Sequence, residues 1–232
     1  MKRFYKQVSV APTEGGFQIH LDGRPVRTPS KAVLVVPAGA LAEAMAAEWD
    51  AQTDTIDPAA MPLTRHANTA IDRVSPQRAA VVGEISRYGE NDLICYRAEW
   101  PTDLAERQAR TWNPLVDWAR RRYDVNLTVT AGIMHRRQGE DALQRLARAV
   151  DSLSDWELAP LHTLTTITGS LVIALALREG EISPEAAFEA GQLDELYQVE
   201  KWGEDSLAQK ARESRRADLL AAARFLALLR TA

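Results

Sequence analysis

Alternating hydrophobic and polar residues near the start of the chain predict β-strands. Residues 8–10 follow this alternation, and Phe17, Ile19 and Leu21 share one face of a second predicted strand. The Asp-Gly pair at 22–23 favours a tight hairpin, because glycine tolerates the positive φ that such turns require. The pattern therefore predicts a small β-rich layer in this part of the chain.

Helical periodicity begins at Ala38 and continues through residues 41–49. Prolines at 58 and 62 then predict an ordered bend, because proline restricts its own backbone and that of the residue before it. Beyond this bend the pattern is mostly helical. The last predicted helix carries an apolar stripe at 219, 220, 223, 226 and 227, with arginines on its other face.

Three serines mark predicted helix starts. Ser75 and Ser183 each precede a proline, which suits a capping hydroxyl followed by proline at the first helical position. Ser154 and Glu157 have the spacing of a capping box, in which the glutamate reaches back to the amide of the capping residue.

The run from Leu158 to Leu177 carries no fixed charge and approaches the length that spans a bilayer. It also contains Pro160, His162, a serine and four threonines, and its hydrophobicity is concentrated from Ile167 onward. We interpret it as one buried central helix of a folded protein, and we expect no membrane insertion.

These elements predict an α+β fold, with a small N-terminal β-rich layer followed by a larger helical bundle. We expect a first domain over residues 1–74, with one or two helices of its own, and a helical domain over residues 75–232. The 232 residues include 46% hydrophobic and 26% charged residues, which is ordinary for a folded soluble protein.

Charge and cysteine content exclude some classes of function. The formal net charge is −4, whereas a nucleic-acid-binding protein usually carries a basic surface that neutralises phosphates. One cysteine permits no internal disulfide, and Cys95 lies in an apolar patch where a small buried hydrophobe is expected. The sequence lacks a phosphate-binding loop and a nucleophile elbow, and its four histidines are scattered, so we expect no cofactor or metal.

Carboxylates cluster late in the chain, at Asp194, Glu195, Glu200, Glu204 and Asp205. Glu200 and Glu204 share a face if this segment is helical. Three interpretations remain open from the residues alone: a solvated acidic face, a patch that binds a protein partner, or acid–base groups of a hydrolase or lyase that uses Asp194, Glu200, Glu204 and Asp205.

The six tryptophans divide into two kinds. Trp112 and Trp118 are six residues apart on a predicted amphipathic helix with Leu115, so we expect both to pack inside. Trp202 instead lies among charged residues, which is typical of an interface anchor. A half-buried tryptophan that covers the helical core would give the same pattern.

Four stretches of the chain resemble the family of F(1)-ATPase assembly chaperones that act on the alpha subunit. The first two are Glu48-Trp49-Asp50-Ala51-Gln52 with Ile56, Pro58, Met61-Pro62-Leu63-Thr64 and Asn68-Thr69-Ala70-Ile71-Asp72, and then Asp92-Leu93-Ile94-Cys95-Tyr96-Arg97-Ala98. The third is Trp112-Asn113-Pro114-Leu115 with Trp118. The fourth runs from Thr168-Gly169-Ser170-Leu171 through Gly180 to Leu193-Asp194-Glu195, and continues to Gln198 and Glu200-Lys201-Trp202-Gly203-Glu204-Asp205. The stretches span most of the chain in the expected order.

The resemblance implies a chaperone and not an enzyme. Such a protein binds the free alpha subunit, shields the surface that alpha buries against beta in the finished ring, and releases alpha when beta assembles. Exposed apolar surface of that kind promotes aggregation. Because the start of the sequence shows no transit peptide, we expect a bacterial member of the family that works in the cytoplasm, with mitochondrial homologues. We also expect it to be monomeric alone.

We expect Glu200, Trp202 and Asp205 to belong to the partner-binding surface, with Asp194 and Trp49 as further candidates. In this hypothesis the acidic helix engages basic groups of the alpha subunit while Trp202 anchors an apolar spot. A helical scaffold for another protein partner, and the hydrolase or lyase described above, are the alternatives.

Overall fold

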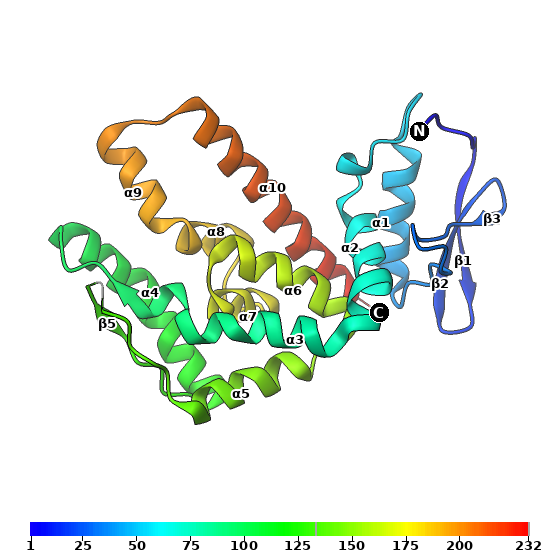
Figure 1. The fold of residues 1–232 in the computed structure, drawn as a ribbon. Coiled ribbons are helices and arrows are strands. Elements are labelled where there is room, and N and C mark those ends of the chain that lie inside the picture. The colour runs from blue at the N-terminus through cyan, green and yellow to red at the C-terminus, as the bar shows by residue number, and fades with distance from the viewer. Residues whose placement is uncertain (133, 232) are drawn as a thin grey trace. The chain divides into compact units, whose positions relative to one another are not determined.

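The computed structural model describes residues 1–132 and 134–231, and it combines a small antiparallel sheet with a larger set of helices (Figure 1). The α+β class expected from the sequence is confirmed. The chain forms two compact units. Unit 1 contains residues 1–78, 154–160 and those from 221 onward, and unit 2 contains residues 79–153 and 161–220. The division into domains 1–74 and 75–232 stays a prediction.

The sheet of unit 1 consists of β1 (Val8–Thr13), β2 (Gly16–Leu21) and β3 (Arg24–Pro25), in that order and antiparallel. Val8 pairs with Leu21 and Thr13 with Gly16 in the first hairpin, and Leu21 pairs with Arg24 across Asp22-Gly23, so the hairpin predicted there is confirmed. Gly16 has a φ of +150°, and a Cβ there would lie 2.3 Å from the carbonyl oxygen of Val36. This position therefore requires glycine.

Helix α1 (Gly39–Asp50) packs on β1 and β2, and α2 (Pro62–Thr69) packs on α1. A short 3₁₀ turn (Pro58–Ala60) lies between the two helices, where the prolines predicted a bend. Unit 1 has its own core, and Phe225 of α10 (Ser206–Leu229) is buried in it. The largest fully buried side chains of this core are Ile19, Leu34, Leu41, Met45, Leu63 and Phe225.

The predicted cap at Ser75 is wrong. The backbone stays helical from α2 through a π turn (Ala70–Val74) and a 3₁₀ turn (Ser75–Gln77) into α3 (Arg78–Arg87). Ser75 itself has helical φ and ψ of −54° and −49°, whereas a capping residue has extended backbone angles. Because a π turn accommodates an extra residue without ending the helix, the Ser-Pro pair lies inside a helical path.

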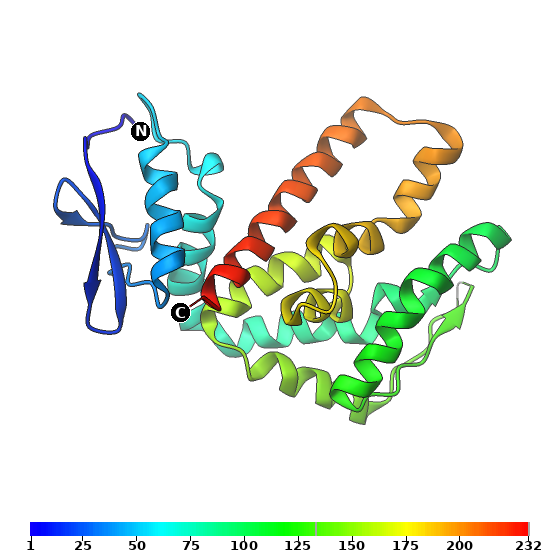
Figure 2. The ribbon, with the colours of Figure 1, turned by 180° about the vertical axis from the view of Figure 1, so that it is seen from behind.

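Unit 2 is mostly helical (Figure 2). Its longest helix apart from α10 is α4 (Thr102–Tyr123), which packs on the buried helix α7 (Leu171–Glu179). Trp112, Leu115 and Trp118 of α4 are buried, as predicted. The other helices are α5 (Glu140–Asp151), α6 (Asp155–Thr168, which begins in unit 1), α8 (Pro184–Gly191) and α9 (Leu193–Trp202). Two 3₁₀ turns (Tyr88–Asn91 and Leu93–Cys95) and a parallel pair of short strands, β4 (Tyr96–Arg97) and β5 (Thr130–Ala131), complete the described elements.

The single helix expected over residues 158–177 is also wrong, because two helices occupy this run. Helix α6 ends at Thr168, and Gly169 follows with a φ of +67°. Ser170 then caps α7, and its hydroxyl accepts a hydrogen bond from the amide of Ile173 at 3.0 Å. All residues from Leu171 to Leu177 are buried, so the predicted burial is confirmed. None of the helices in the described part of the chain is sufficiently long and apolar to cross a bilayer.

The other predicted caps are confirmed. The Ser183 hydroxyl accepts a hydrogen bond from the amide of Ala186 at 3.1 Å. Glu157 accepts hydrogen bonds from the amide and the hydroxyl of Ser154, at 3.0 and 2.8 Å. Cys95 is buried as well, and burial raises the pKa of its thiol to about 12.

Asp92 is a buried carboxylate at the centre of unit 2. It is fully shielded from solvent and accepts hydrogen bonds from the amides of Ile94 at 3.3 Å and Val172 at 3.0 Å. The Val172 amide belongs to the first turn of α7, where backbone N–H groups lack partners within the helix. Burial raises the pKa of Asp92 to about 6, against the opposing effect of these hydrogen bonds.

Replacement of two glycines should have opposite effects on stability. A Cβ at Gly191 would lie 2.8 Å from the Cα and Cβ of Thr168, so Gly191→Ala should lower the free energy of unfolding by about 1–3 kcal/mol. Gly83 lies within α3 with open space around it, so Gly83→Ala should raise it by about 0.5–1 kcal/mol. Urea unfolding of both variants measures the two effects, and a stable Gly191→Ala variant would contradict the close packing of α8 against α6.

The raised pKa of Asp92 should also be visible in the pH dependence of stability. Because the native protein holds this proton to about pH 6 whereas the unfolded chain releases it near 3.8, the contribution of Asp92 to stability falls as the pH rises between these values. The unfolding free energy of Asp92→Asn relative to wild type should therefore rise by up to about 3 kcal/mol from pH 4 to pH 7. The matched variant Asp117→Asn, at an exposed ion pair with Arg120, should show no such rise. An equal pH dependence in the two variants would refute the shift.

Candidate functional site

Four of the five predicted partner-binding residues lie on α9 or directly after it. Leu193 and Tyr197 on one face of α9 are buried, whereas Glu200 and Trp202 are exposed. The helix ends where Gly203 adopts a φ of +87°, which a residue with a side chain rarely adopts. Its exposed carboxylates and its terminal tryptophan therefore come together by local helical geometry.

Helix α4 holds the end of α9 through Asp103. This carboxylate accepts a hydrogen bond from the Tyr197 hydroxyl at 2.7 Å and forms an ion pair with Lys201 at 3.0 Å. Both interactions lower the pKa of Asp103. Lys201 and Arg107 also lie near the Tyr197 ring, at 5.2 and 5.3 Å from its centroid. The end of α9 thus lies against the first turns of α4.

Asp194 has a structural partner at the other end of α9. Its carboxylate accepts a hydrogen bond at 2.7 Å from the side-chain amide of Gln108, which is only 1% exposed. The same Gln108 accepts a hydrogen bond from the amide of Ala98 at 2.7 Å. Because Gln108 bonds to both segments, Asp194 contributes to the position of α9 whatever else it binds.

Glu200 is exposed and forms an ion pair with Arg107 of α4 at 2.7 Å. The hydrogen bond from Arg107 lowers the pKa of Glu200. A general acid needs a raised pKa to hold its proton near neutral pH, so this shift is opposite to the one that a general acid at Glu200 requires. A carboxylate that stays ionised and exposed is suited to contacts with basic groups.

The remaining acids connect α9 with α10. Glu195 pairs with Arg212 at 3.3 Å and with Arg215 at 2.7 Å, and Glu204 pairs with Arg212. Asp205 accepts hydrogen bonds from the amides of Leu207 and Ala208, at 3.0 and 2.9 Å, so it caps the start of α10. Asp205 therefore has a structural role in addition to the predicted partner contact.

Trp202 is 77% exposed, which rules out the alternative that it covers the helical core. The sequence analysis missed a second exposed tryptophan, because Trp100 is 82% exposed. Trp100 precedes α4 by two residues, and the Asp103–Lys201 ion pair brings this segment next to the end of α9. The signal was present in the sequence, where Trp100 stands between Glu99 and Pro101 and outside any apolar run.

Trp49 belongs to unit 1 and not to this cluster. It is half-buried on α1, edge-on to the Tyr5 ring at 5.8 Å, and its carbonyl accepts a hydrogen bond from the Tyr5 hydroxyl at 2.7 Å. Its indole nitrogen is buried, and it has no hydrogen-bond partner among the described residues. The contacts of Trp49 are those of a residue that closes the edge of a core.

In the described part of the chain, no three histidine, cysteine, aspartate or glutamate side chains come together as ligands for a metal ion. The site is thus a solvent-facing helix end with two exposed tryptophans and a set of paired charges.

Comparisons with known proteins identify the family of this chain. The ATP12 chaperone protein family matches residues 2–120. The crystal structure of Atp12 from Paracoccus denitrificans is 42% identical and superposes with a TM-score of 0.95, over 99% of this chain and 98% of that one. The mitochondrial protein atp12 of Schizosaccharomyces pombe is 26% identical over 87% of this chain and 74% of its own length. The mitochondrial ATP12 of Saccharomyces cerevisiae is 24% identical over 88% of this chain and 76% of its own length.

The fold and these relatives define a chaperone of the class that serves ATP synthase assembly. The resemblance inferred from the sequence motifs is thereby confirmed. The chain belongs to the ATP12 chaperone family.

Gln108 should be the residue on which the position of α9 depends most. Gln108→Ala removes the hydrogen bonds to Asp194 and Ala98 from a side chain that is 1% exposed, so the free energy of unfolding should fall by about 1–3 kcal/mol. The exposed Gln209, whose side chain bonds only to Glu213 among the described residues, provides the control. Gln209→Ala should change the unfolding free energy by less than about 0.5 kcal/mol. Similar urea midpoints for the two variants would show that Gln108 does not hold α9.

Proposed function

We propose that this chain binds the free alpha subunit of F(1)-ATPase, shields the surface that alpha buries against beta, and releases alpha when beta assembles. The observation that carries the proposal is the exposure of Trp202 at the end of α9, beside an ionised Glu200. Membership in the ATP12 chaperone family supports the class of function, and the alpha subunit is the client that the motif resemblance implies.

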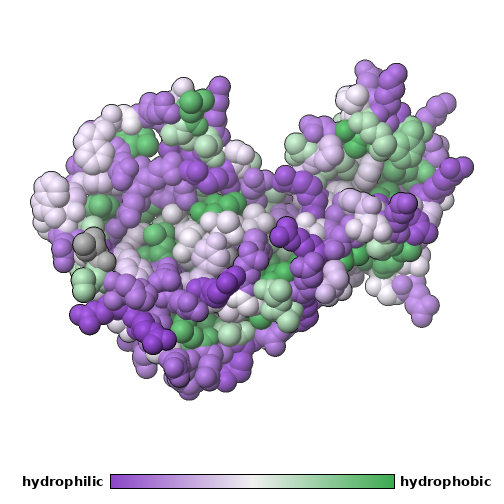
Figure 3. Space-filling model, in the orientation of Figure 1, coloured by the Kyte–Doolittle hydropathy of each residue, from purple (hydrophilic) through white to green (hydrophobic). Residues whose placement is uncertain are grey.

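An exposed tryptophan favours a protein partner. Tryptophan buries a large apolar area, and it is enriched among the residues that contribute most to binding energy. Trp100, next to the same helix end, adds a second such side chain. Hydrophilic residues are interspersed with hydrophobic ones over the face of unit 2 in Figure 3. This mixture is typical of an interface that forms and dissociates, in contrast to a permanent, mainly apolar one.

The paired charges suit exchange of partners. Glu200 is already bound to Arg107, so a basic group of the client would compete with Arg107 for the same carboxylate. The net gain from such a contact is small, because one ion pair replaces another in solvent. In this proposal Glu200 provides orientation and discrimination, while the two tryptophans provide most of the affinity.

The other predicted residues have different parts in the proposal. Asp205 and Asp194 support the surface by capping α10 and by seating α9, and their carboxylates contribute charge near the client. Trp49 of unit 1 would be a separate contact. The bacterial cytoplasm stays our prediction for the compartment in which this member of the family works, and the two yeast relatives are mitochondrial proteins.

The client is tested by co-expression of this chain with the alpha and beta subunits from the same organism. We expect more soluble alpha when this chain is present, retention of alpha but not beta on the tagged chaperone, and loss of alpha from it when beta is added. Retention of neither subunit would refute the proposed client. Retention of another protein would favour the alternative of a helical scaffold.

Glu200→Lys should abolish retention of alpha while leaving the thermal unfolding midpoint nearly unchanged. The substitution places a cation beside Arg107 and facing the client, and Glu200 is exposed, so the effect on binding should exceed the effect on folding. Pull-down and thermal unfolding of the same preparation measure both.

The matched control is Glu189→Lys, which makes the same change of charge at an exposed position of α8. It should retain alpha as wild type does. Loss of alpha in both variants would indicate a general effect of net charge, and survival of alpha binding in Glu200→Lys would limit Glu200 to a solvation role.

A further inference from the structure

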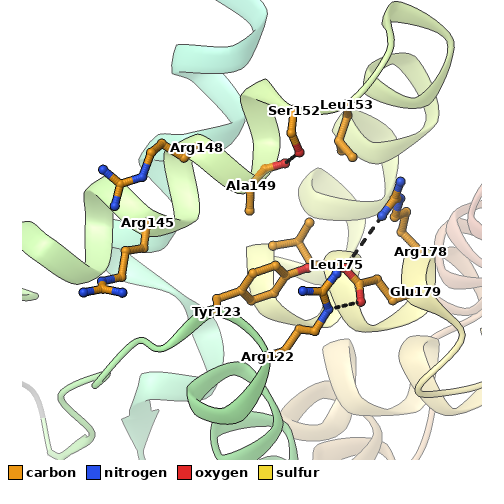
Figure 4. A pocket seen from close by; sticks show the side chains of 10 residues that line it. All are labelled: Arg122, Tyr123, Arg145, Arg148, Ala149, Ser152, Leu153, Leu175, Arg178 and Glu179. Atoms are coloured by element: carbon orange, nitrogen blue, oxygen red, sulfur yellow. Dashed lines mark hydrogen bonds and ion pairs between the residues drawn. The ribbon is translucent and has the colours of Figure 1, made fainter.

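A cavity of about 360 Å³ lies in unit 2, and none of the residues assigned to the client is among those that line it (Figure 4). Its walls come from the end of α4, from α5 and from the end of α7. Leu153 and Leu175 supply apolar wall, and the other contributors are mainly charged. The volume is at the lower end of the range of about 300–1,000 Å³ that is usual for small-molecule sites.

Four arginines line this cavity: Arg122, Arg145, Arg148 and Arg178. The one carboxylate in the lining is Glu179, which accepts hydrogen bonds from Arg122 and from the Tyr123 hydroxyl. These hydrogen bonds keep the pKa of Glu179 low although burial opposes them. Glu179 alone does not balance the four arginines of the lining, although Asp124 and Asp141 outside the lining pair with Arg145.

The arginines differ in the ion pairs and hydrogen bonds that they already form. Arg145 pairs with Asp141 at 2.8 Å and with Asp124 at 2.6 Å. The guanidinium of Arg148, one turn further along α5, forms no ion pair or hydrogen bond among the described residues. Arg145 and Arg148 are three residues apart and so lie on the same side of α5. In Figure 4 both guanidinium groups lie on one side of the cavity, and Arg122 and Arg178 lie near Glu179.

We propose that this cavity binds a phosphate-class oxyanion, either inorganic phosphate or a phosphate monoester. A guanidinium presents several N–H donors in one plane, and a tetrahedral dianion accepts from several such groups at once. The single carboxylate of Glu179 already accepts hydrogen bonds from two donors. The arginines of three helices offer further N–H donors, which an anion with more acceptor oxygens can use. The volume leaves room for a small substituent on the phosphate.

Helix-end electrostatics give a second reason for basic residues here, since α4, α5 and α7 all end near this cavity and cations favour helix C-termini. That effect acts on any cation in the last turn, including Arg121 of α4, which does not line the cavity. The additional feature is that arginines of α4, α5 and α7 line one cavity, and a charge-matched comparison of Arg148 with Arg121 separates the two explanations.

The test is titration of the isolated protein with inorganic phosphate and with glycerol 3-phosphate, by calorimetry at a fixed ionic strength set with chloride. Constant ionic strength is necessary because salt screens an exposed charged site. We expect saturable binding in wild type, and about tenfold or more weaker binding in Arg148→Gln. Arg121→Gln removes the same charge from an exposed position of α4 and should bind as wild type does.

Each outcome of the titration either supports or overturns the proposed anion site. Binding of inorganic phosphate supports a site for the free ion, and binding of the ester alone supports a site for phosphorylated metabolites. Absence of saturable binding of both, or equal binding by wild type and Arg148→Gln, overturns the proposal, as does equal weakening in the two variants. Because Arg148 is exposed, unchanged thermal unfolding of Arg148→Gln verifies that the variant is folded. No client subunit is present, so the result is independent of the proposed chaperone activity.

Discussion

The arrangement of unit 2 depends on one buried carboxylate at the start of its central helix. Asp92 satisfies backbone N–H groups at the N-terminus of α7, which are inaccessible to water. Helix α7 is buried from Leu171 to Leu177, and α4 packs on it. Helix α4 in turn supplies Asp103, Arg107 and Gln108, which hold α9. The orientation of the exposed Trp202 therefore depends on a series of contacts that begins at the buried Asp92.

The surface at the end of α9 combines two kinds of interaction with different costs on binding. Its charges are paired within the chain, so a partner gains little by replacing those pairs. Its two exposed tryptophans have no equivalent partner among the described residues, so burial against another protein is a net gain of apolar contact. An interface of this composition can be specific without being permanent, which is the requirement for a chaperone that must surrender its client.

The features that were predicted correctly from the sequence are those that local interactions determine. The hairpin at Asp22-Gly23 and the caps at Ser154 and Ser183 depend on residues within a few positions of one another. The run from Leu158 to Leu177 was misread as one helix because its hydrophobicity is continuous, whereas a single glycine with positive φ divides it. The Ser75 cap failed for the opposite reason, since tertiary packing kept a helical path through a Ser-Pro pair.

The candidate site was predictable as a list of residues and not as a geometry. The clustering of Glu200 and Trp202 follows from helical spacing. The partner of Glu200 is 93 positions away in the chain, at Arg107, and no pattern in the sequence connects the two. The exposure of Trp202 and Trp100 likewise depends on which faces of α9 and α4 the rest of unit 2 covers, and only the three-dimensional structure determines that.

The path of the chain through unit 1 has a consequence for biosynthesis. Phe225 is fully buried in a core whose other large side chains precede residue 64, and all of unit 2 is encoded between them. When the sheet, α1 and α2 have been synthesised, the core of unit 1 still lacks the side chain of Phe225. Unit 1 can then close only after α10 emerges, so its core stays incomplete, with apolar surface uncovered, while the residues of unit 2 are translated.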